Sequence, residues 1–134
     1  MKKLLQSSLV LAAVVPFLGM EIQGVRAADG DKKHTIAQIM DLAHKKRKGE
    51  PSLLNEVKSG KATDEQKQEL DRLYEEMATY KAPHGDQAHW EKLNKELVQA
   101  AKQVAEGKEG AIKELNKAAN CRECHSAHQG KKSL

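Results

Sequence analysis

The chain has few aromatic residues, with one Trp, two Tyr and one Phe among 134 residues, and it has only three Pro. Strands favour β-branched and aromatic side chains, so this composition excludes an all-β fold and favours helices. Basic and acidic residues nearly balance, at 23 against 19, which excludes a dedicated nucleic-acid binder. A chain of this length fits one domain.

The sequence also lacks an apolar run long enough to cross a bilayer, although a shorter run lies near its start. The uninterrupted run covers residues 9–20, whereas a membrane span takes about 20 residues. Two lysines precede this run and the triplet Val25-Arg26-Ala27 follows it, which is typical of a secretory signal peptide. We expect cleavage after Ala27, so that residues 28–134 form the mature domain in the periplasm or another extracytoplasmic space, with no membrane span. A retained membrane anchor is the alternative.

Apolar residues recur at intervals of three and four along the mature chain, which predicts amphipathic helices. Capping residues and Gly or Pro breaks divide this pattern into segments. The segments are a helix from Thr35 to about Lys48, one or two turns between Pro51 and Gly60, a helix from Thr63 to a break at residues 81–85, a helix from Asp86 to Gly107, and a last helix from about Glu109 to His128. Short loops force neighbouring helices to run in opposite directions, so we expect an all-α fold, an antiparallel four-helix bundle.

The two cysteines of the chain lie in one motif near the C-terminus. Residues 121–125 read Cys-Arg-Glu-Cys-His, the C-x-x-C-H pattern of covalent haem c attachment. Two thiols three residues apart lie on one helical face, about one turn apart, so each can add to one vinyl group of the same porphyrin. The imidazole of His125 can then bind the iron. The motif therefore predicts one covalent haem c on Cys121 and Cys124.

Three other interpretations of the two cysteines are open. A thioredoxin-like pair would open a helix that follows a strand, whereas this pair is expected to close the last helix of an all-helical chain. A zinc site would use Cys121, Cys124, His125 and His128, but four ligands within eight residues of one helix can hardly surround one ion. A non-haem structural bundle would join the two cysteines in a disulfide, which an oxidising compartment allows.

An exported helical chain whose C-x-x-C-H lies in the last helix resembles the bacterial cytochrome c-prime family, including its low-spin relatives. The resemblance covers residues 34–128 in architecture, and its specific motif is confined to residues 121–125. It implies a four-helix bundle with haem c on the fourth helix, His125 as the proximal iron ligand, and a distal residue from the first helix. Many members carry a basic residue four positions after the proximal histidine, where this chain has Gln129.

The first predicted helix offers two candidates for the distal ligand. Met40 lies on its apolar face, where the low-spin relatives place a methionine ligand and the high-spin members a nonpolar residue that leaves the iron open. Without the resemblance, a methionine on such a face is ordinary core packing. His44, one turn after Met40, is the alternative ligand. Of the other histidines, we expect His34, His84 and His89 at the surface, and His128 on the same side of the porphyrin as His125.

Together these patterns predict an exported monohaem c-type cytochrome that carries single electrons between other redox proteins and is not an enzyme. Glu75 and Glu76 are adjacent on a helix and point in different directions, so they do not indicate acid–base catalysis. If Met40 and His44 both stay off the iron, the alternative is a five-coordinate haem protein that binds nitric oxide or carbon monoxide. A homodimer is left open, because some relatives form one.

Overall fold

The computed structural model describes residues 34–46 and 48–130, and the predicted leader at residues 1–27 lies outside them. Within the described residues there are six helices and no strand, which confirms the expected all-α class. The helices are α1 (Ile36–His44), α2 (Leu53–Lys58), α3 (Asp64–Ala78), α4 (Gln87–Ala105), α5 (Ala111–Ala118) and α6 (Cys121–His128).

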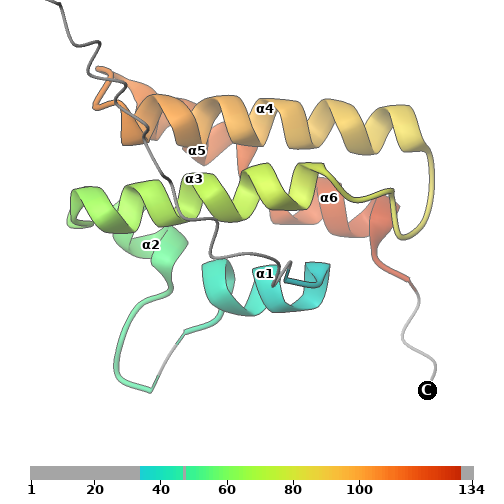
Figure 1. Cartoon of the computed structure of the whole chain (residues 1–134), viewed down its shortest axis with the longest axis horizontal. Coiled ribbons are helices and arrows are strands. Elements are labelled where there is room, and N and C mark those ends of the chain that lie inside the picture. The colour runs from blue at the N-terminus through green and yellow to red at the C-terminus, as the bar shows by residue number, and fades with distance from the viewer. Residues whose placement is uncertain (1–33, 47, 131–134) are drawn as a thin grey trace, which may run out of the picture. The chain divides into compact units, whose positions relative to one another are not determined.

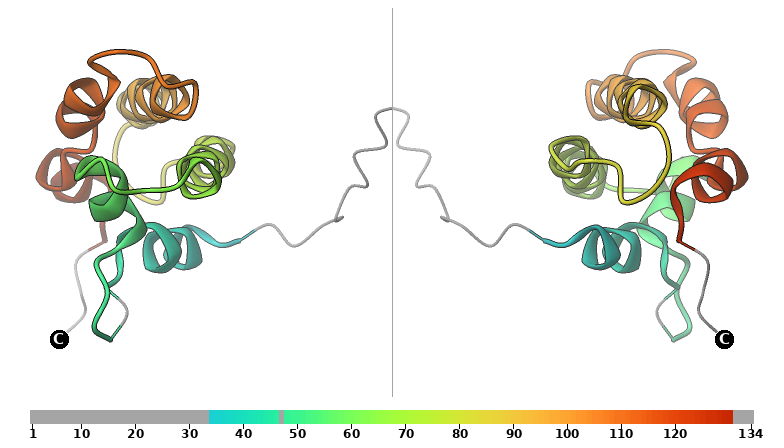
Figure 2. Two further views of the ribbon diagram at one scale, coloured as in Figure 1. Left: turned by 90° about the vertical axis from the view of Figure 1, so that its left-hand side faces the viewer. Right: turned by 90° about the vertical axis from the view of Figure 1, so that its right-hand side faces the viewer.

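Helices α3 and α4 are the two longest, and they lie side by side in opposite directions (Figure 1). Helix α5 packs on α4, while α1 and α2 pack on α3, and α2 also reaches α5. Viewed along the long helices, the shorter ones surround one side of the α3–α4 pair (Figure 2). The buried side chains between them form one apolar core, which includes Trp90 and whose largest fully buried members are Tyr74, Ile39, Leu70, Leu115 and Val57.

The predicted helix starts are confirmed. Thr63 accepts a hydrogen bond from the Gln66 amide at 3.3 Å, and the Gln66 side chain accepts one from the Thr63 amide at 2.8 Å. Thr35 begins α1 with the same reciprocal pair. The carboxylate of Asp86 accepts from the amide of His89 at 2.7 Å and begins α4. Each cap satisfies backbone amides that have no partner within the helix.

The first helix is shorter than predicted, because α1 ends at His44 rather than near Lys48. Lys45 already has an extended backbone, with φ −79° and ψ 129°. The residues that follow are cationic, and those described between 45 and 51 are exposed. A further helical turn would bury no apolar side chain and would gather like charges, so nothing stabilises it.

The prediction of one continuous last helix is wrong, because a break at Ala119 and Asn120 divides the segment into α5 and α6. Ala119 leaves the helical region with φ −79° and ψ 50°. Asn120 then begins a new helix, since its side-chain oxygen accepts a hydrogen bond from the amide of Glu123 at 3.3 Å. Asparagine is among the best residues for beginning a helix and a weak one within it, so the break follows from local chemistry.

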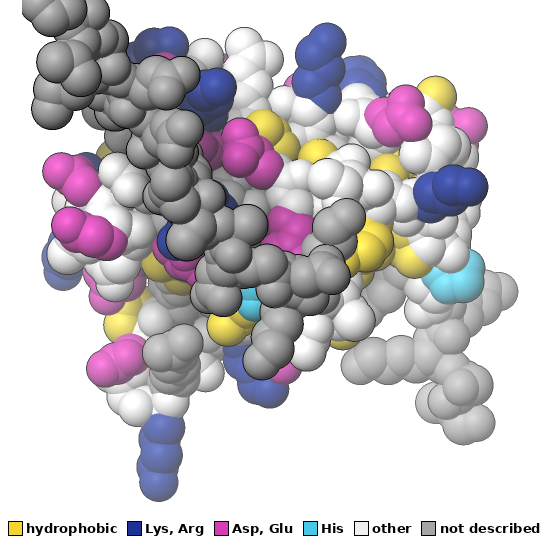
Figure 3. All heavy atoms as spheres, viewed as in Figure 1, with side chains coloured by type: hydrophobic (Ala, Val, Ile, Leu, Met, Phe, Trp, Pro, Cys, Tyr) yellow, Lys and Arg dark blue, Asp and Glu magenta, His cyan; other side chains and the backbone are white. Residues whose placement is uncertain are grey.

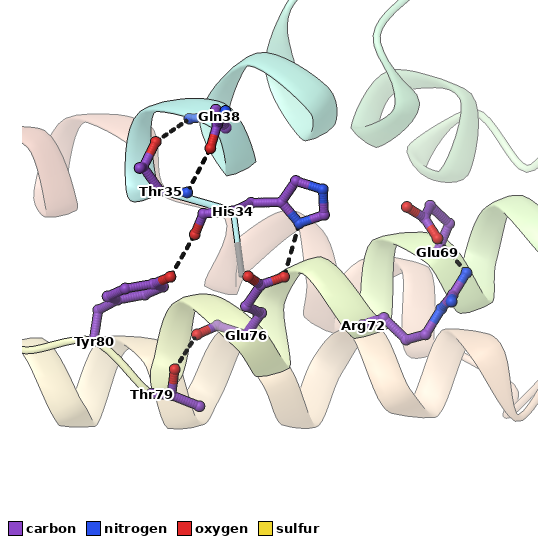
Figure 4. Close-up of polar contacts among 8 residues, drawn as sticks. All are labelled: His34, Thr35, Gln38, Glu69, Arg72, Glu76, Thr79 and Tyr80. Carbon is purple, nitrogen blue, oxygen red and sulfur yellow. Dashed lines mark hydrogen bonds and ion pairs between the residues drawn. The ribbon is translucent and has the colours of Figure 1, made fainter. Parts of the chain in front are cut away.

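Polar contacts join His34, just before α1, to α3 and to Tyr80, which follows α3 (Figure 4). The Nδ1 of His34 donates to the Glu76 carboxylate at 2.9 Å, and the Tyr80 hydroxyl donates to the His34 carbonyl. His34 is therefore half-buried rather than exposed as expected. These contacts fix the α1 segment that carries Met40 and His44 against α3.

On the face seen in Figure 3, acidic and basic side chains are interspersed over α3 and α4. Ion pairs such as Lys67 with Asp64, at 2.9 Å, join neighbours on one helix. No helix in the described part of the chain has the length and apolar character needed to cross a membrane.

Candidate haem-binding site

The C-x-x-C-H motif forms the first turn of α6. Cys121 is the first residue of this helix and is exposed, whereas Cys124 is half-buried and packs against the apolar core. Both thiols are free. The expectation that the pair closes a long helix is therefore wrong, because the cysteines open a short one. No strand precedes them in the described residues, so the thioredoxin-like arrangement is not formed.

One face of α6 carries Cys121, Cys124, His125 and His128. The last three follow Cys121 by three, four and seven residues, the spacing that puts residues on the same side of a helix. The two ends of this face differ. His125 is exposed near its start, and His128 is buried at its end. On this face Cys121 and His125 are therefore accessible, whereas Cys124 is half-buried.

His44, the last residue of α1, lies beside Tyr74 in the middle of α3. The Nε2 of His44 and the hydroxyl of Tyr74 are hydrogen-bonded at 3.2 Å, and the two ring centres are 5.9 Å apart. Tyr74 is fully buried. The sequence predicts Tyr74 as a core residue only, because a tyrosine on an apolar face gives no local signal that its hydroxyl meets a histidine from another helix.

Charges from α6 and α2 reach this pair of residues. Burial is the main reason why the pKa of His44 is lowered, and the positive charges of His125 and Lys58 lower it further. Burial raises the pKa of Tyr74, and the charge of Cys121 adds to this effect. Charge effects of this kind act over several ångströms without contact, and of the described helices only α4 comes within 8 Å of α6 between Cα atoms.

The two candidate distal residues are one helical turn apart on α1. Met40 is half-buried and packs against the apolar core, and His44 is half-buried with its imidazole on Tyr74. The charge of His125 is among the influences that lower the pKa of His44. Met40 lies one turn before His44 on α1, and neither residue is on a helix that comes within 8 Å of α6 between Cα atoms.

The donor set fits a c-type haem. The porphyrin supplies four nitrogens to the iron, so a c-type haem needs two thiols and one or two axial side chains from the protein. The first turn of α6 offers the free thiols of Cys121 and Cys124 and the exposed imidazole of His125. Burial raises the pKa of the Cys124 thiol, and the charges of Cys121 and Glu123 add to this effect, so the fold favours its protonated form.

The zinc alternative is not assembled. In the described residues, no three His, Cys, Asp or Glu side chains are grouped so that they could hold a metal ion. His128, which the zinc site would need, is 2% exposed and uses both ring nitrogens in hydrogen bonds to His84 and His89.

A cavity of about 620 Å³ lies elsewhere, between α2, α3 and the segment that follows α1. Its lining combines apolar residues such as Leu53 and Leu73 with charged ones such as Glu69 and Arg72. None of the proposed haem-binding residues lines it, so it belongs to a different part of the surface.

Comparisons with protein-family models, curated proteins and solved structures found no match to this chain.

Proposed function

We propose that this protein is an exported monohaem c-type cytochrome that carries single electrons between other redox proteins. The observation that carries the proposal is the C-x-x-C-H motif in the first turn of α6, with both thiols free and the His125 imidazole exposed. The leader predicted at residues 1–27 supports the proposal, because haem c is normally attached outside the cytoplasm.

Cys121 and Cys124 would each form one thioether. In each addition the sulfur bonds to one vinyl carbon and the hydrogen goes to the other, so nothing is released. Cys121 is exposed and open to this reaction, and Cys124 faces the core, where it would hold the inner edge of the group. His125 would bind the iron as the proximal ligand, and its exposed imidazole is free to do so.

The distal side would come from α1. The resemblance to the cytochrome c-prime family favours Met40 as the sixth ligand, and His44 is the alternative. Methionine sulfur stabilises the reduced iron and raises the reduction potential, whereas a second imidazole gives a lower one. Either residue would make the iron six-coordinate, which suits electron transfer because little has to move when the charge changes.

The fold supports the same proposal. Helices α1 and α2 together, and α5 and α6 together, would each take the place of one bent helix beside α3 and α4. The arrangement would then be the expected antiparallel four-helix bundle, with haem c on its last helix. A bound haem would also add apolar contacts to a core that contains few aromatic side chains.

Intact mass tests this proposal. The full-length chain is expressed with a cytochrome c maturation system, and we expect a species heavier by one haem that keeps its haem stain after denaturing electrophoresis. Cys121→Ala and Cys124→Ala should each lose one thioether or give no stable holoprotein. Ser126→Ala is the matched control, because Ser126 is exposed on the same helix. A bare polypeptide mass for the unchanged chain would refute the proposal.

The His44–Tyr74 hydrogen bond favours one second candidate, a five-coordinate haem protein that binds nitric oxide or carbon monoxide. If Tyr74 retains the imidazole and Met40 stays off the iron as well, a coordination position is left open for a gas. Absorption spectra distinguish the two functions: a high-spin ferric protein that binds carbon monoxide when reduced would support gas binding, and a low-spin protein that does not would support electron transfer.

A further inference from the structure

His128 makes directed contacts at the end of α6. Its side chain is 2% exposed, its Nδ1 donates to the carbonyl of His84 at 2.7 Å, and its Nε2 is hydrogen-bonded to Nδ1 of His89 at 3.0 Å. The His84 carbonyl lies in the loop before α4, and His89 lies in the first turn of α4. The imidazole of His128 therefore links the end of α6 to the loop before α4 and to the first turn of α4.

Packing holds the same imidazole in one orientation. The ring of His89 is stacked on it, with centres 5.1 Å apart, and Trp90 meets it edge-on at 5.3 Å. Gly85 brings the loop so close to α6 that an added Cβ would lie 2.5 Å from the carbonyl oxygen of Ala127. The end of α6 is thus enclosed by the loop and by α4.

Besides His128, only Cys124 of α6 packs against the apolar core, and it is half-buried. Of the eight side chains of α6 His128 alone is buried, and of the described helices only α4 comes within 8 Å of α6 between Cα atoms. The break at Asn120 separates α6 from α5, so the orientation of α6 is not fixed by that of α5. An eight-residue helix has little stability of its own. His128 is therefore the main anchor of α6.

His128 shares its helical face with the attachment residues. A rotation of α6 that released His128 from His84 and His89 would also turn Cys121 and His125, because they lie on the same face of the helix. We propose that His128 is a positioning residue, which sets the rotation of the haem-attachment helix through its two hydrogen bonds to the start of α4. The positioning role rests on the proposed function, whereas the two hydrogen bonds of His128 do not depend on haem.

Three variants of the full-length chain test the anchor without haem. His128→Leu fills the space without hydrogen bonds, His128→Gln keeps one donor and one acceptor, and Ser126→Ala is the control because Ser126 is exposed on the same helix. Amide hydrogen exchange is measured for α6 and α4. We expect His128→Leu to speed exchange in α6 about tenfold or more while α4 stays protected. Ser126→Ala should match the unchanged chain, and His128→Gln should restore most of the protection.

The same variants carrying haem test the positioning role, through the ferric electron paramagnetic resonance spectrum, which reports how the axial ligands are oriented. His128→Leu should shift or broaden the signals, and His128→Gln and Ser126→Ala should not. Unchanged exchange in α6 of His128→Leu would overturn the inference. Faster exchange with an unchanged haem spectrum would also overturn it, since His128 would then be structural only. If the unchanged chain takes up no haem, the proposed function and the positioning role fail together, and the exchange data still decide whether His128 anchors α6.

Discussion

The imidazole of His44 and the phenol of Tyr74 join α1 to α3 through one hydrogen bond, 3.2 Å from Nε2 to the hydroxyl oxygen. A hydrogen bond between partly buried side chains contributes about 1 kcal/mol to stability. We therefore expect Tyr74→Phe to lower the free energy of unfolding of the haem-free chain by about that amount. A double-mutant cycle with His44→Leu, followed by urea denaturation, should give a coupling energy of about 1 kcal/mol. Additive effects of the two substitutions would show that the contact contributes nothing.

The sixth ligand follows from two substitutions on α1. If Met40 binds the iron, Met40→Ala should abolish the weak long-wavelength band that methionine gives in the ferric spectrum, and it should let carbon monoxide bind the reduced protein. His44→Ala should then change little. The reverse result, in which only His44→Ala makes the haem high-spin, would assign the ligand to His44. Each variant serves as the control for the other, because they lie one turn apart on one helix.

Gly85 combines two constraints. Its φ of +76° strains any other residue, and an added Cβ would collide with the backbone of Ala127. Gly107 has a similar φ of +70° but open space around it. We expect Gly107→Ala to cost about 1 kcal/mol from strain alone, and Gly85→Ala about 3 kcal/mol or more. Thermal denaturation of both variants measures the difference, and equal losses would rule out a tight contact between the loop and α6.

Asp71 should make stability depend on pH. Burial and the nearby Glu75 raise its pKa above the ordinary 3.8, although Lys102 opposes them, and its Oδ1 is buried without a hydrogen-bond partner. The folded state then holds the proton more tightly than the unfolded chain, so stability falls as pH rises through the window between these pKa values. Asp71→Asn should raise the melting temperature at about pH 7 and lose that advantage at about pH 3.

Asp64 provides the opposite case on the same helix. A hydrogen bond from Lys67 lowers the pKa of Asp64, so its charged form is favoured in the folded state. Asp64→Asn should lower the melting temperature at neutral pH, and this loss should vanish in acid as the native carboxylate protonates. If the two Asp→Asn variants shift stability in the same direction, the environments assigned to these carboxyl groups are wrong.

Local signals in the sequence were sufficient for most helix boundaries. The Thr63–Gln66 pair and Asp86 begin helices where predicted, because a cap depends on residues only three positions apart. The Asn120 break was missed although its signal is also local, with Glu123 three residues later. Leu115 and Ala119 are four residues apart, as on one continuous helix, so the apolar spacing gave no sign of the break.

The contacts that shape the candidate site could not be found in this way. His44 meets Tyr74 thirty residues along the chain, and His128 meets His84 and His89 about forty residues away. Such partners are set by how helices pack, which the spacing of apolar residues does not specify. The attachment motif itself needs no packing to be recognised, because its residues are contiguous.

The break before α6 also bears on the order in which the chain folds. A helix of eight residues is marginal in water until it has something to dock on, and the loop and α4 residues that receive His128 lie earlier in the chain. The segment with Cys121 and Cys124 should therefore stay extended and accessible until α3 and α4 have paired. If the protein is exported as proposed, the enzyme that attaches haem outside the cytoplasm would reach both thiols in a segment that is not yet folded, before Cys124 becomes half-buried.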